Sequence, residues 1–346
     1  MSQGEQRWQE VATGVHAWIY PPGGWGQSNA GLVLATDASD EALLFDAQWD
    51  EPSTTHMLQE APLDRHRIGT LVNSHPDGDH TWGNAVVGAE RIIATDACNA
   101  HFDHEDPQRL GLLVAAASRI GRAPLVRLPG PLRTVNGPHL LLRYLAAMGR
   151  GFDFGGVRLT WPTETFSGEL DLTVGGRALT LIEVGPTHSH GDAILHLPAD
   201  RVVFAADVLF VGVSPIMWVG PLSNWQAALA TILALKPTVV VPGHGPVSGV
   251  AEVATFAEHL AWIAEVGDRQ RTARRSPLDG AFDALTSQEY RSSPWADWIS
   301  PERLVVTLTA MQREAENGPP IEGVQQRARL VTQMAVLADR LARASR

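Results

Sequence analysis

Two histidines and two aspartates stand within one short segment, His75-Pro76-Asp77-Gly78-Asp79-His80, directly after an apolar run that reads as a β-strand. A loop that follows a strand can turn several side chains toward one point, and Gly78 permits a tight curve of the backbone. Imidazole and carboxylate are ligands that zinc, iron and manganese accept. The segment therefore indicates a metal site, whereas a solvated turn rich in Pro, Asp and Gly is the alternative interpretation.

Three later residues favour the metal site. His188 follows a predicted strand at residues 178–184, Asp207 ends the apolar strand at residues 201–206, and His244 ends the apolar run that begins at residue 238. An unpaired carboxylate is costly to bury at the end of an apolar strand, so Asp207 needs cationic or metal partners. Four strand ends thus present histidine or aspartate, as a His/Asp metal site requires.

With these residues the sequence resembles the metallo-β-lactamase superfamily, over roughly residues 10–250. The family signature is His-x-His-x-Asp-His, followed by a lone histidine, a bridging aspartate and a final histidine. Residues 28–31 and 43–46 also look like the first strands of that family. The corresponding positions hold His75, Asp77, Asp79, His80, His188, Asp207 and His244. The departure is Asp77, where most of the superfamily has its second histidine.

The resemblance implies two divalent metal ions, with zinc expected first and iron or manganese as alternatives. One ion would be held by His75, Asp77 and His188, and the other by Asp79, His80 and His244, with Asp207 bridging them. A carboxylate at position 77 adds negative charge and favours zinc, iron or manganese over soft metals. Two alternatives stay open: Asp77 points away so that only the second site fills tightly, or the chain is akin to the flavodiiron branch. Residues 250–346 lack the phosphate-binding loop that the second alternative needs.

The resemblance implies an enzyme that performs metal-assisted hydrolysis. Two neighbouring metal ions lower the pKa of a shared water and polarise the bond to be cleaved. Asp79 would be the catalytic residue that orients this water and relays its proton. We expect a small organic substrate with an ester, thioester, lactone or amide bond. The alternatives are a di-iron oxidoreductase or oxygenase on the same fold, and a non-catalytic protein that binds a metal or senses a ligand.

Aromatic residues near these motifs are candidates for substrate binding. Trp25 stands in a glycine-rich loop and could act as a mobile lid, Trp82 follows the first motif, and Trp218 follows Asp207 by one loop. Together they could line an apolar pocket for an aromatic or acyl group. His190 lies two residues past His188 and could also contact substrate. Core packing explains the tryptophans equally well, and a surface position explains His190.

Further polar residues have two possible roles. Asp46 and Asp192 could fix the imidazole tautomers, or they could cap turns. His101 and His104 lie in the polar segment 101–106, which we expect to be the solvated start of a helix rather than part of a metal site.

These side chains require a frame of strands and helices. Strand-like runs occur near residues 15–20, 31–36, 42–46, 69–74, 91–95, 170–174, 178–184, 193–197, 201–206 and 238–241. Helices are expected from about residue 53, from Ser223 with Gln226 in a capping box, and at the end of the chain through Leu330, Met334 and Leu337. The pattern predicts an α/β fold, an αββα sandwich at residues 1–250 with an insertion at about 102–156, and an appended helical region at residues 251–346.

Composition sets the remaining limits. The 346 residues are 44% hydrophobic and carry a net charge of −11, which disfavours nucleic acid as a partner. Cys98 is the only cysteine, so the chain forms no internal disulfide and offers no thiolate cluster. The polar start has no signal-peptide core, and no apolar run reaches the ~18 residues that span a bilayer. We therefore expect a cytoplasmic protein with a small-molecule substrate, no membrane partner and a possible homodimer.

Overall fold

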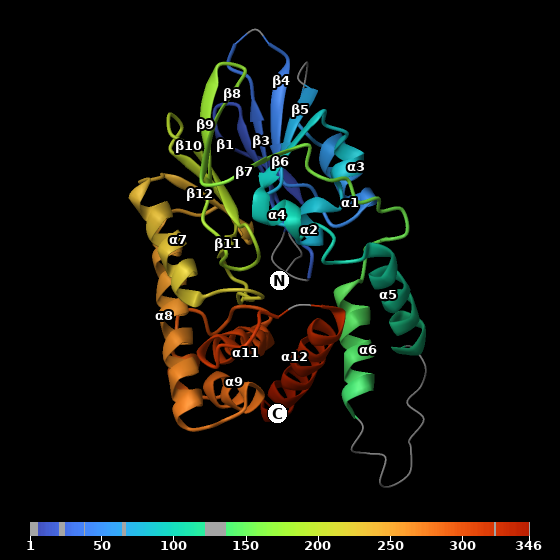
Figure 1. Ribbon diagram of the computed structural model, residues 1–346, viewed down its shortest axis with the longest axis vertical. Helices are drawn as coiled ribbons and strands as arrows, with labels where there is room; N and C mark the ends of the chain where they lie inside the picture. Colours follow the sequence, from blue (N-terminus) through green and yellow to red (C-terminus); the bar gives the residue numbers. More distant parts are fainter. Residues whose placement is uncertain are drawn as a thin grey trace.

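The computed structural model describes residues 6–20, 25–37, 39–63, 67–121, 136–321 and 323–345. Two β-sheets lie in the upper half of the molecule, and helices cover their outer sides and the lower end (Figure 1). This arrangement confirms the predicted α/β sandwich with additional C-terminal helices. Among the described residues, no helix combines the length and the apolar character that crossing a bilayer requires.

The first sheet holds seven strands in chain order. They are β1 (Arg7–Ala12), β2 (Val15–Ile19), β3 (Ala30–Leu34), β4 (Glu41–Phe45), β5 (Arg67–Val72), β6 (Arg91–Thr95) and β7 (Glu164–Phe166). Strands β1 to β4 pair antiparallel, whereas β4 to β7 pair parallel. The sequence pattern missed β1 and β7, because β1 is a largely exposed edge strand and β7 is only three residues long.

The second sheet has the strand order β12-β11-β10-β9-β8. Its strands are β8 (Glu169–Val174), β9 (Arg177–Glu183), β10 (Ala193–Leu197), β11 (Val202–Phe210) and β12 (Val239–His244). Strands β8 to β11 form the predicted antiparallel hairpins, and helix α7 (Leu222–Ala234) connects β11 to the parallel strand β12. The predicted Ser223 cap is wrong, since α7 begins one residue earlier and Pro221 precedes it without a side-chain cap.

Apolar side chains from both sheets form the core between them. The rings of Phe45 on β4 and Phe204 on β11 lie 5.9 Å apart across this core. Gly31 on β3 is part of the same contact, because a Cβ atom there would lie 2.5 Å from the ring of Phe204. The packed core holds the ends of the strands in fixed positions, and the candidate site lies at these ends.

Short helices follow several strands of the first sheet. They are α1 (Glu51–Gln59), α2 (Gly78–Thr81), α3 (Asn84–Val87) and α4 (Asp96–Ala100). Between β6 and β7 the described residues contain a helical hairpin, α5 (Pro107–Gly121) and α6 (Asn136–Met148). It occupies the predicted insertion.

The last part of the chain is helical, as predicted. Its helices are α8 (Val250–Thr272), α9 (Pro277–Leu285), α10 (Gln288–Arg291), η2 (Pro301–Arg303), α11 (Leu304–Ala315) and α12 (Val324–Ala344). Helices α8, α11 and α12 share an apolar core with β11 and α7, and α12 lies against α6 (Figure 1). The helices therefore cover the lower end of the sandwich. The boundary between the two regions at residue 250 stays a prediction.

Candidate metal centre

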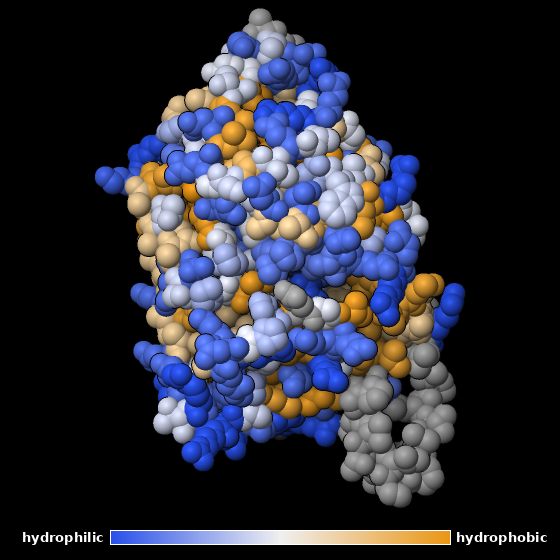
Figure 2. Space-filling view, viewed as in Figure 1, coloured by the Kyte–Doolittle hydropathy of each residue, from blue (hydrophilic) through white to orange (hydrophobic). Residues whose placement is uncertain are grey.

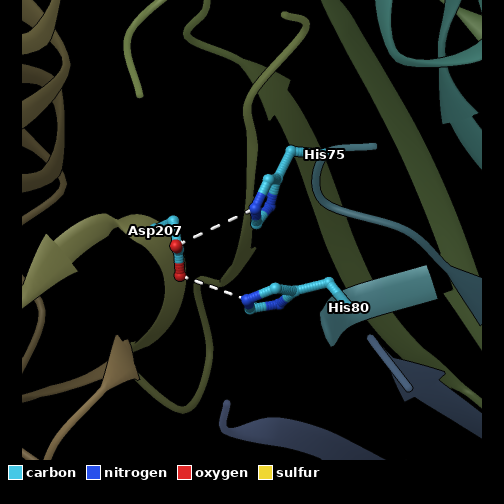
Figure 3. A group of neighbouring side chains, drawn as sticks. All are labelled: His75, His80 and Asp207. Carbon is cyan, nitrogen blue, oxygen red and sulfur yellow. Dashed lines mark ion pairs between the residues drawn. The ribbon is translucent and has the colours of Figure 1, made fainter. Parts of the chain in front are cut away.

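The carboxylate of Asp207 lies between four imidazole rings. Its Oδ1 is 3.2 Å from Nε2 of His80 and 3.3 Å from Nε2 of His244. Its Oδ2 is 3.4 Å from Nε2 of His188 and 3.9 Å from Nε2 of His75. Figure 3 shows the carboxylate facing the rings of His75 and His80. One acidic group is thus shared by four histidines from three separate segments of the chain.

Two further carboxylates join this group. Oδ2 of Asp79 is 3.6 Å from Nε2 of His244 and 3.9 Å from Nε2 of His80. Oδ2 of Asp77 is 3.0 Å from Nε2 of His188. Three clusters could each hold an ion, namely His75, Asp77 and His188; Asp79, His80 and His244; and His75, His80 and Asp207. The structure therefore brings together all seven predicted ligands in the predicted sets, while the binding of metal by each of them stays a prediction.

The ends of buried strands position most of these residues. His75 follows β5, His188 follows β9, and His244 is the last residue of β12. Asp207 differs from the prediction, because β11 does not end at Ala206 but continues to Phe210. The pairing of β11 with β12 shifts register at Ala206, which has a left-handed φ of 44°, so Asp207 leaves the regular ladder without ending the strand.

Gly243 allows the close approach of the two strands at this point. A Cβ atom on Gly243 would lie 2.0 Å from Oδ1 of Asp207. A larger residue here would displace the carboxylate from the histidines. The glycine that precedes the last ligand is therefore part of the construction of the site.

The far side of each imidazole ring is held by an oxygen atom. In three rings Nδ1 faces an oxygen that can only accept a hydrogen bond, which assigns the proton to Nδ1 in the neutral ring. These pairs are His80 with Asp46 at 2.9 Å, His188 with the carbonyl of Ile216 at 2.6 Å, and His244 with the carbonyl of Gln27 at 3.0 Å. In the fourth ring, Nδ1 of His75 is 2.8 Å from the hydroxyl of Ser74. The Nε2 atoms of the first three rings consequently face the shared carboxylates.

The inner atoms of the cluster fit a divalent metal ion. Nε2 of His75, Nε2 of His80 and Oδ1 of Asp207 are buried and have no hydrogen-bond partner among the described residues. Leaving such atoms unsatisfied is costly. Ligand atoms that share one tetrahedral zinc ion at about 2.1 Å lie roughly 3.4 Å from one another. The separations of 3.2 to 3.9 Å around Asp207 are of this size.

The charges in the site are strongly coupled in the absence of metal. Burial lowers the pKa of His80, but the carboxylates of Asp207, Asp79 and Asp46 outweigh it and raise that pKa well above its usual range. Burial opposes the charged ring of His188 as well, yet the hydrogen bond to Asp77 and the charge of Asp207 raise its pKa to about 9. Protons therefore occupy these rings near neutral pH, and a metal ion would displace them.

Asp46 and Asp192, which could either fix imidazole tautomers or cap turns, differ in what they contact. Asp46 accepts hydrogen bonds from the hydroxyl of Ser74 at 2.7 Å and from Nδ1 of His80, so it fixes a candidate ligand. Asp192 accepts instead from Thr187 and Ser189 within its own loop. Asp192 therefore caps the turn that carries His188 and contacts that ring only indirectly.

The expectation that His104 lies in a solvated segment is wrong. Its Nε2 lies 3.0 Å from Oδ1 of Asp77, and its Nδ1 faces the carbonyl of His101 at 2.7 Å. The neighbouring Glu105 accepts a hydrogen bond from the backbone N–H of Gly78. Asp77, His104 and Glu105 thus form a fourth cluster of possible metal ligands. The sequence offered no signal for this contact, since His104 lies in the insertion, far from the motif it meets.

The four predicted substrate contacts divide into two groups. Trp25, Trp82 and Trp218 line a single cavity of about 260 Å³. His190 does not line it and stacks on the ring of His101 with the centroids 3.6 Å apart. The role of all four in binding substrate stays a prediction.

The loop of Trp25 was expected to be a mobile lid. Residues 21–24 lie outside the described residues, but the indole itself is in contact with other groups. Its N–H donates to the hydroxyl of Tyr144 at 3.1 Å, and the guanidinium of Arg303 lies 4.4 Å from the ring centre. Both partners come from the added helical segments, so these segments hold the indole in place.

Solved structures of low sequence identity share the fold. A metallo-beta-lactamase from Pontibacter korlensis is 15% identical, with a TM-score of 0.50 over 74% of this chain and 99% of that chain. A stereoselective inverting sec-alkylsulfatase from Pseudomonas sp. is 14% identical, with a TM-score of 0.59 over 89% of this chain and 50% of that chain. The second match covers a larger share of this chain than the first.

One curated protein matches a limited segment. The alpha subunit of 2,4-dinitroanisole O-demethylase from Nocardioides sp. (strain JS1661) is 34% identical over 88 residues. The matched segment spans 24% of this chain and 26% of that protein. The match is therefore too short to transfer an activity.

A family model decides the membership. The model of the metallo-beta-lactamase superfamily matches residues 23–244, well over half of the chain and the whole span of the predicted ligands. The match confirms the resemblance drawn from the motifs, and the predicted class of enzyme, a metallo-hydrolase, agrees with it. The chain belongs to the metallo-beta-lactamase superfamily.

Proposed function

We propose that the protein is a metal-dependent hydrolase that acts on a small organic molecule with an ester, thioester, lactone or amide bond. The observation that carries this proposal is the position of the Asp207 carboxylate among four imidazoles, with buried nitrogen and oxygen atoms that have no hydrogen-bond partner within the described part of the chain. Such a set of donors suits zinc, with iron or manganese as alternatives.

The proposed ligands have distinct tasks. His75, Asp77 and His188 would hold one ion, Asp79, His80 and His244 would hold the other, and Asp207 would bridge them. Bound metal would supply Lewis acidity and a water nucleophile at neutral pH. The aspartate at the second site would accept and pass on the proton of that water. Asp79 suits this role because its side chain, at 17% exposure, is more accessible than Asp207 at 5% or His244 at 6%.

Metal content and turnover test the proposal together. The purified chain, loaded separately with zinc, iron or manganese, is assayed on a panel of esters, thioesters, lactones and amides. We expect hydrolysis that is lost in His80→Ala together with bound metal. The matched control is His56→Ala, an exposed histidine on α1, which should keep both. Metal binding without turnover on the whole panel would support a sensing role instead.

A second candidate function has one specific observation in its favour. The demethylase subunit, by its name, belongs to an enzyme that acts on an aryl methyl ether, and a segment of this chain resembles it. Together with the carboxylate at Asp77, which suits iron, this keeps an oxidative or ether-cleaving reaction as the alternative. A coloured iron protein that consumes oxygen would favour the oxidative alternative, whereas a colourless zinc protein that hydrolyses the ester panel and leaves aryl methyl ethers intact would exclude both forms of it.

A further inference from the structure

We propose that the cavity beside the candidate metal centre binds a single, uncharged aromatic ring of the substrate. The inference rests on the proposed function and adds the class of substrate. The walls are apolar side chains together with a small set of charged ones. They comprise Trp25, Trp49, Trp82, His104, Glu105, Asp106, Arg109, Leu110, Leu113, Leu141, Leu145, Met148, Trp218, Val324, Arg327, Ala328 and Val331.

The size of the cavity fits one ring. Its volume is about 260 Å³. In another protein an apolar cavity of about 150 Å³ binds benzene, and pockets for larger, drug-sized ligands begin near 300 Å³. A benzene ring with one or two small substituents therefore fits this cavity, whereas a polycyclic ligand does not.

The cavity directly adjoins the candidate ligands. His104 in its wall lies 3.0 Å from Asp77, and the backbone N–H of Trp218 donates to the carbonyl of His188 at 2.9 Å. Trp82 packs on Gly78, where an added Cβ atom would lie 2.4 Å from the indole. Three wall residues thus contact the segments that carry the ligands. A ring bound in the cavity would place its substituent toward the metal centre.

One ion pair neutralises two of the charged groups of the wall. Arg327 on α12 donates to Oε1 of Glu105 at 2.9 Å, and its guanidinium lies 4.7 Å from the ring centre of Trp218. The pair joins α12 to the segment that contacts Asp77. Neither charge of this pair is left for a ligand, and the other two charged wall residues, Asp106 and Arg109, are exposed to solvent. An uncharged ring is therefore favoured over a carboxylate or an ammonium group in the apolar part of the cavity.

The indoles add specificity for an aromatic ligand. Aromatic rings stack offset or edge to face, and such contacts add to the area buried. The ring of Trp49 lies 6.3 Å from that of Trp82, and the N–H groups of both indoles are buried without a partner among the described residues. A polar substituent such as a carbonyl or nitro oxygen could accept from such a donor.

The added helices supply much of the wall. Leu110 and Leu113 come from α5, Leu145 from α6, and Val331 from α12, which lies outside residues 23–244 that match the family model. Figure 2 shows apolar residues at the surface around the insertion helices, where Leu112 is 74% and Leu113 46% exposed. The wall thus combines residues inside the matched range with α12, which lies outside it.

Binding of acetophenone to the metal-loaded full chain tests the inference. This ketone is aromatic, uncharged and not hydrolysable, so binding is measured by calorimetry without turnover. The comparison ligands are cyclohexyl methyl ketone, which is similar in size but not aromatic, and benzoate, which is charged. We expect acetophenone to bind several-fold more tightly than either one.

Two variants fill the cavity from different sides. Val331→Trp on α12 and Leu113→Trp on α5 should each weaken acetophenone binding at least about tenfold, because overfilling a packed site is costly. The control is Gln325→Trp, on the exposed outer part of α12, which should bind as the wild type does. Circular dichroism confirms that each variant folds.

The outcomes separate this inference from the proposed function. Equal binding of the aromatic and the cyclohexyl ketone, or unchanged binding in both filled variants, would overturn the cavity assignment. If the protein nevertheless hydrolyses esters, the proposed function holds and only the cavity assignment is rejected. Conversely, tight acetophenone binding that the filled variants lose, in a protein that hydrolyses no ester with any metal, would retain the cavity and reject the hydrolase.

Discussion

Buried histidines occur in two very different environments in this molecule. At the strand ends, His80 and His188 face carboxylates, and their pKa values are raised, that of His188 to about 9. In the C-terminal helices, His259 lies among indoles, with Trp295 4.9 Å and Trp298 4.8 Å from its ring, and burial lowers its pKa to about 3.

The difference shows what makes a site. Burial alone opposes the protonated form of every imidazole, whereas nearby carboxylates reverse this effect for His80 and His188. The pKa of His75 stays lowered, because burial and the neighbouring ring of His80 outweigh the carboxylates there. The strand ends combine such carboxylates with fixed ring orientations, so they attract a cation. His259 has neither feature and contributes a neutral ring to the apolar packing. A buried histidine is therefore a candidate ligand only where its neighbours are acidic.

Removing the shared carboxylate should make the strand ends resemble the environment of His259. We expect Asp207→Asn to lower metal affinity and hydrolysis by about a thousandfold or more, because it removes the group that four rings share. The pKa of His188 in the metal-free variant should fall below the value of about 9 in the parent chain, because a raising charge is lost. Elemental analysis and histidine NMR measure the two effects, and unchanged metal content would contradict the bridging role.

Removing a support outside the centre should have a smaller effect. Asp46 accepts from Nδ1 of His80 at 2.9 Å, which fixes the tautomer and orientation of that ring. Loss of such a partner typically costs ten- to a hundredfold in metal affinity. We therefore expect Asp46→Ala to weaken metal binding within that range, as measured by competition with a chelator, while Asp192→Ala should change it less. Equal losses in both variants would point to a general loss of folding.

Loss of the contact between His104 and Asp77 should lower metal affinity less than loss of Asp46. The ring of His104 contacts Oδ1 of Asp77. It therefore positions a candidate ligand but is not one of the four rings around Asp207. We expect His104→Ala to weaken metal binding by about tenfold, at the lower end of such effects. His101→Ala is the matched control, because the bond from His104 uses the backbone carbonyl of that residue. The absorption spectrum of the cobalt-substituted protein should shift in the His104 variant only.

The same contrast explains which features the sequence could reveal. The seven predicted ligands have recognisable types and spacing, and the hydrophobic runs between them predict the central strands. The pattern predicted β4, β5 and β6 to within two residues, because each strand carries adjacent buried apolar residues.

Contacts between distant loops leave no such pattern. The bond from His104 to Asp77 and the ion pair of Arg327 with Glu105 depend on how the insertion and α12 pack, which local residue preferences do not encode. Asp207 illustrates the same limit, because its bulge is a property of two paired strands and not of the run that precedes it. The sequence therefore predicts the composition of the site better than its surroundings.

His259 provides the reverse test, with the smallest expected effect on the metal centre. In the unfolded chain this histidine has a pKa near 6.5, whereas burial lowers it to about 3 in the folded chain. Between these two pH values the unfolded chain binds a proton here and the folded chain does not. The stability that this group contributes is present above pH 6.5 and is lost as the pH falls toward 3. Lowering the pH from 7.5 to 5 should cost about 2 kcal/mol through this group alone.

Replacement of His259 by phenylalanine isolates that contribution. His259→Phe keeps a flat ring beside Trp295 but cannot take up a proton, so its unfolding free energy should fall less between pH 7.5 and 5 than that of the parent chain. Urea unfolding at the two pH values measures the change in unfolding free energy of each protein. The titration of all other groups cancels when the variant is compared with the parent chain. Metal content should not change, because burial lowers the pKa of His259 and no carboxylate contributes to the shift. Identical pH dependence in both proteins would show that the ring is solvated, whereas a loss of metal would show that the two environments are coupled through the helices.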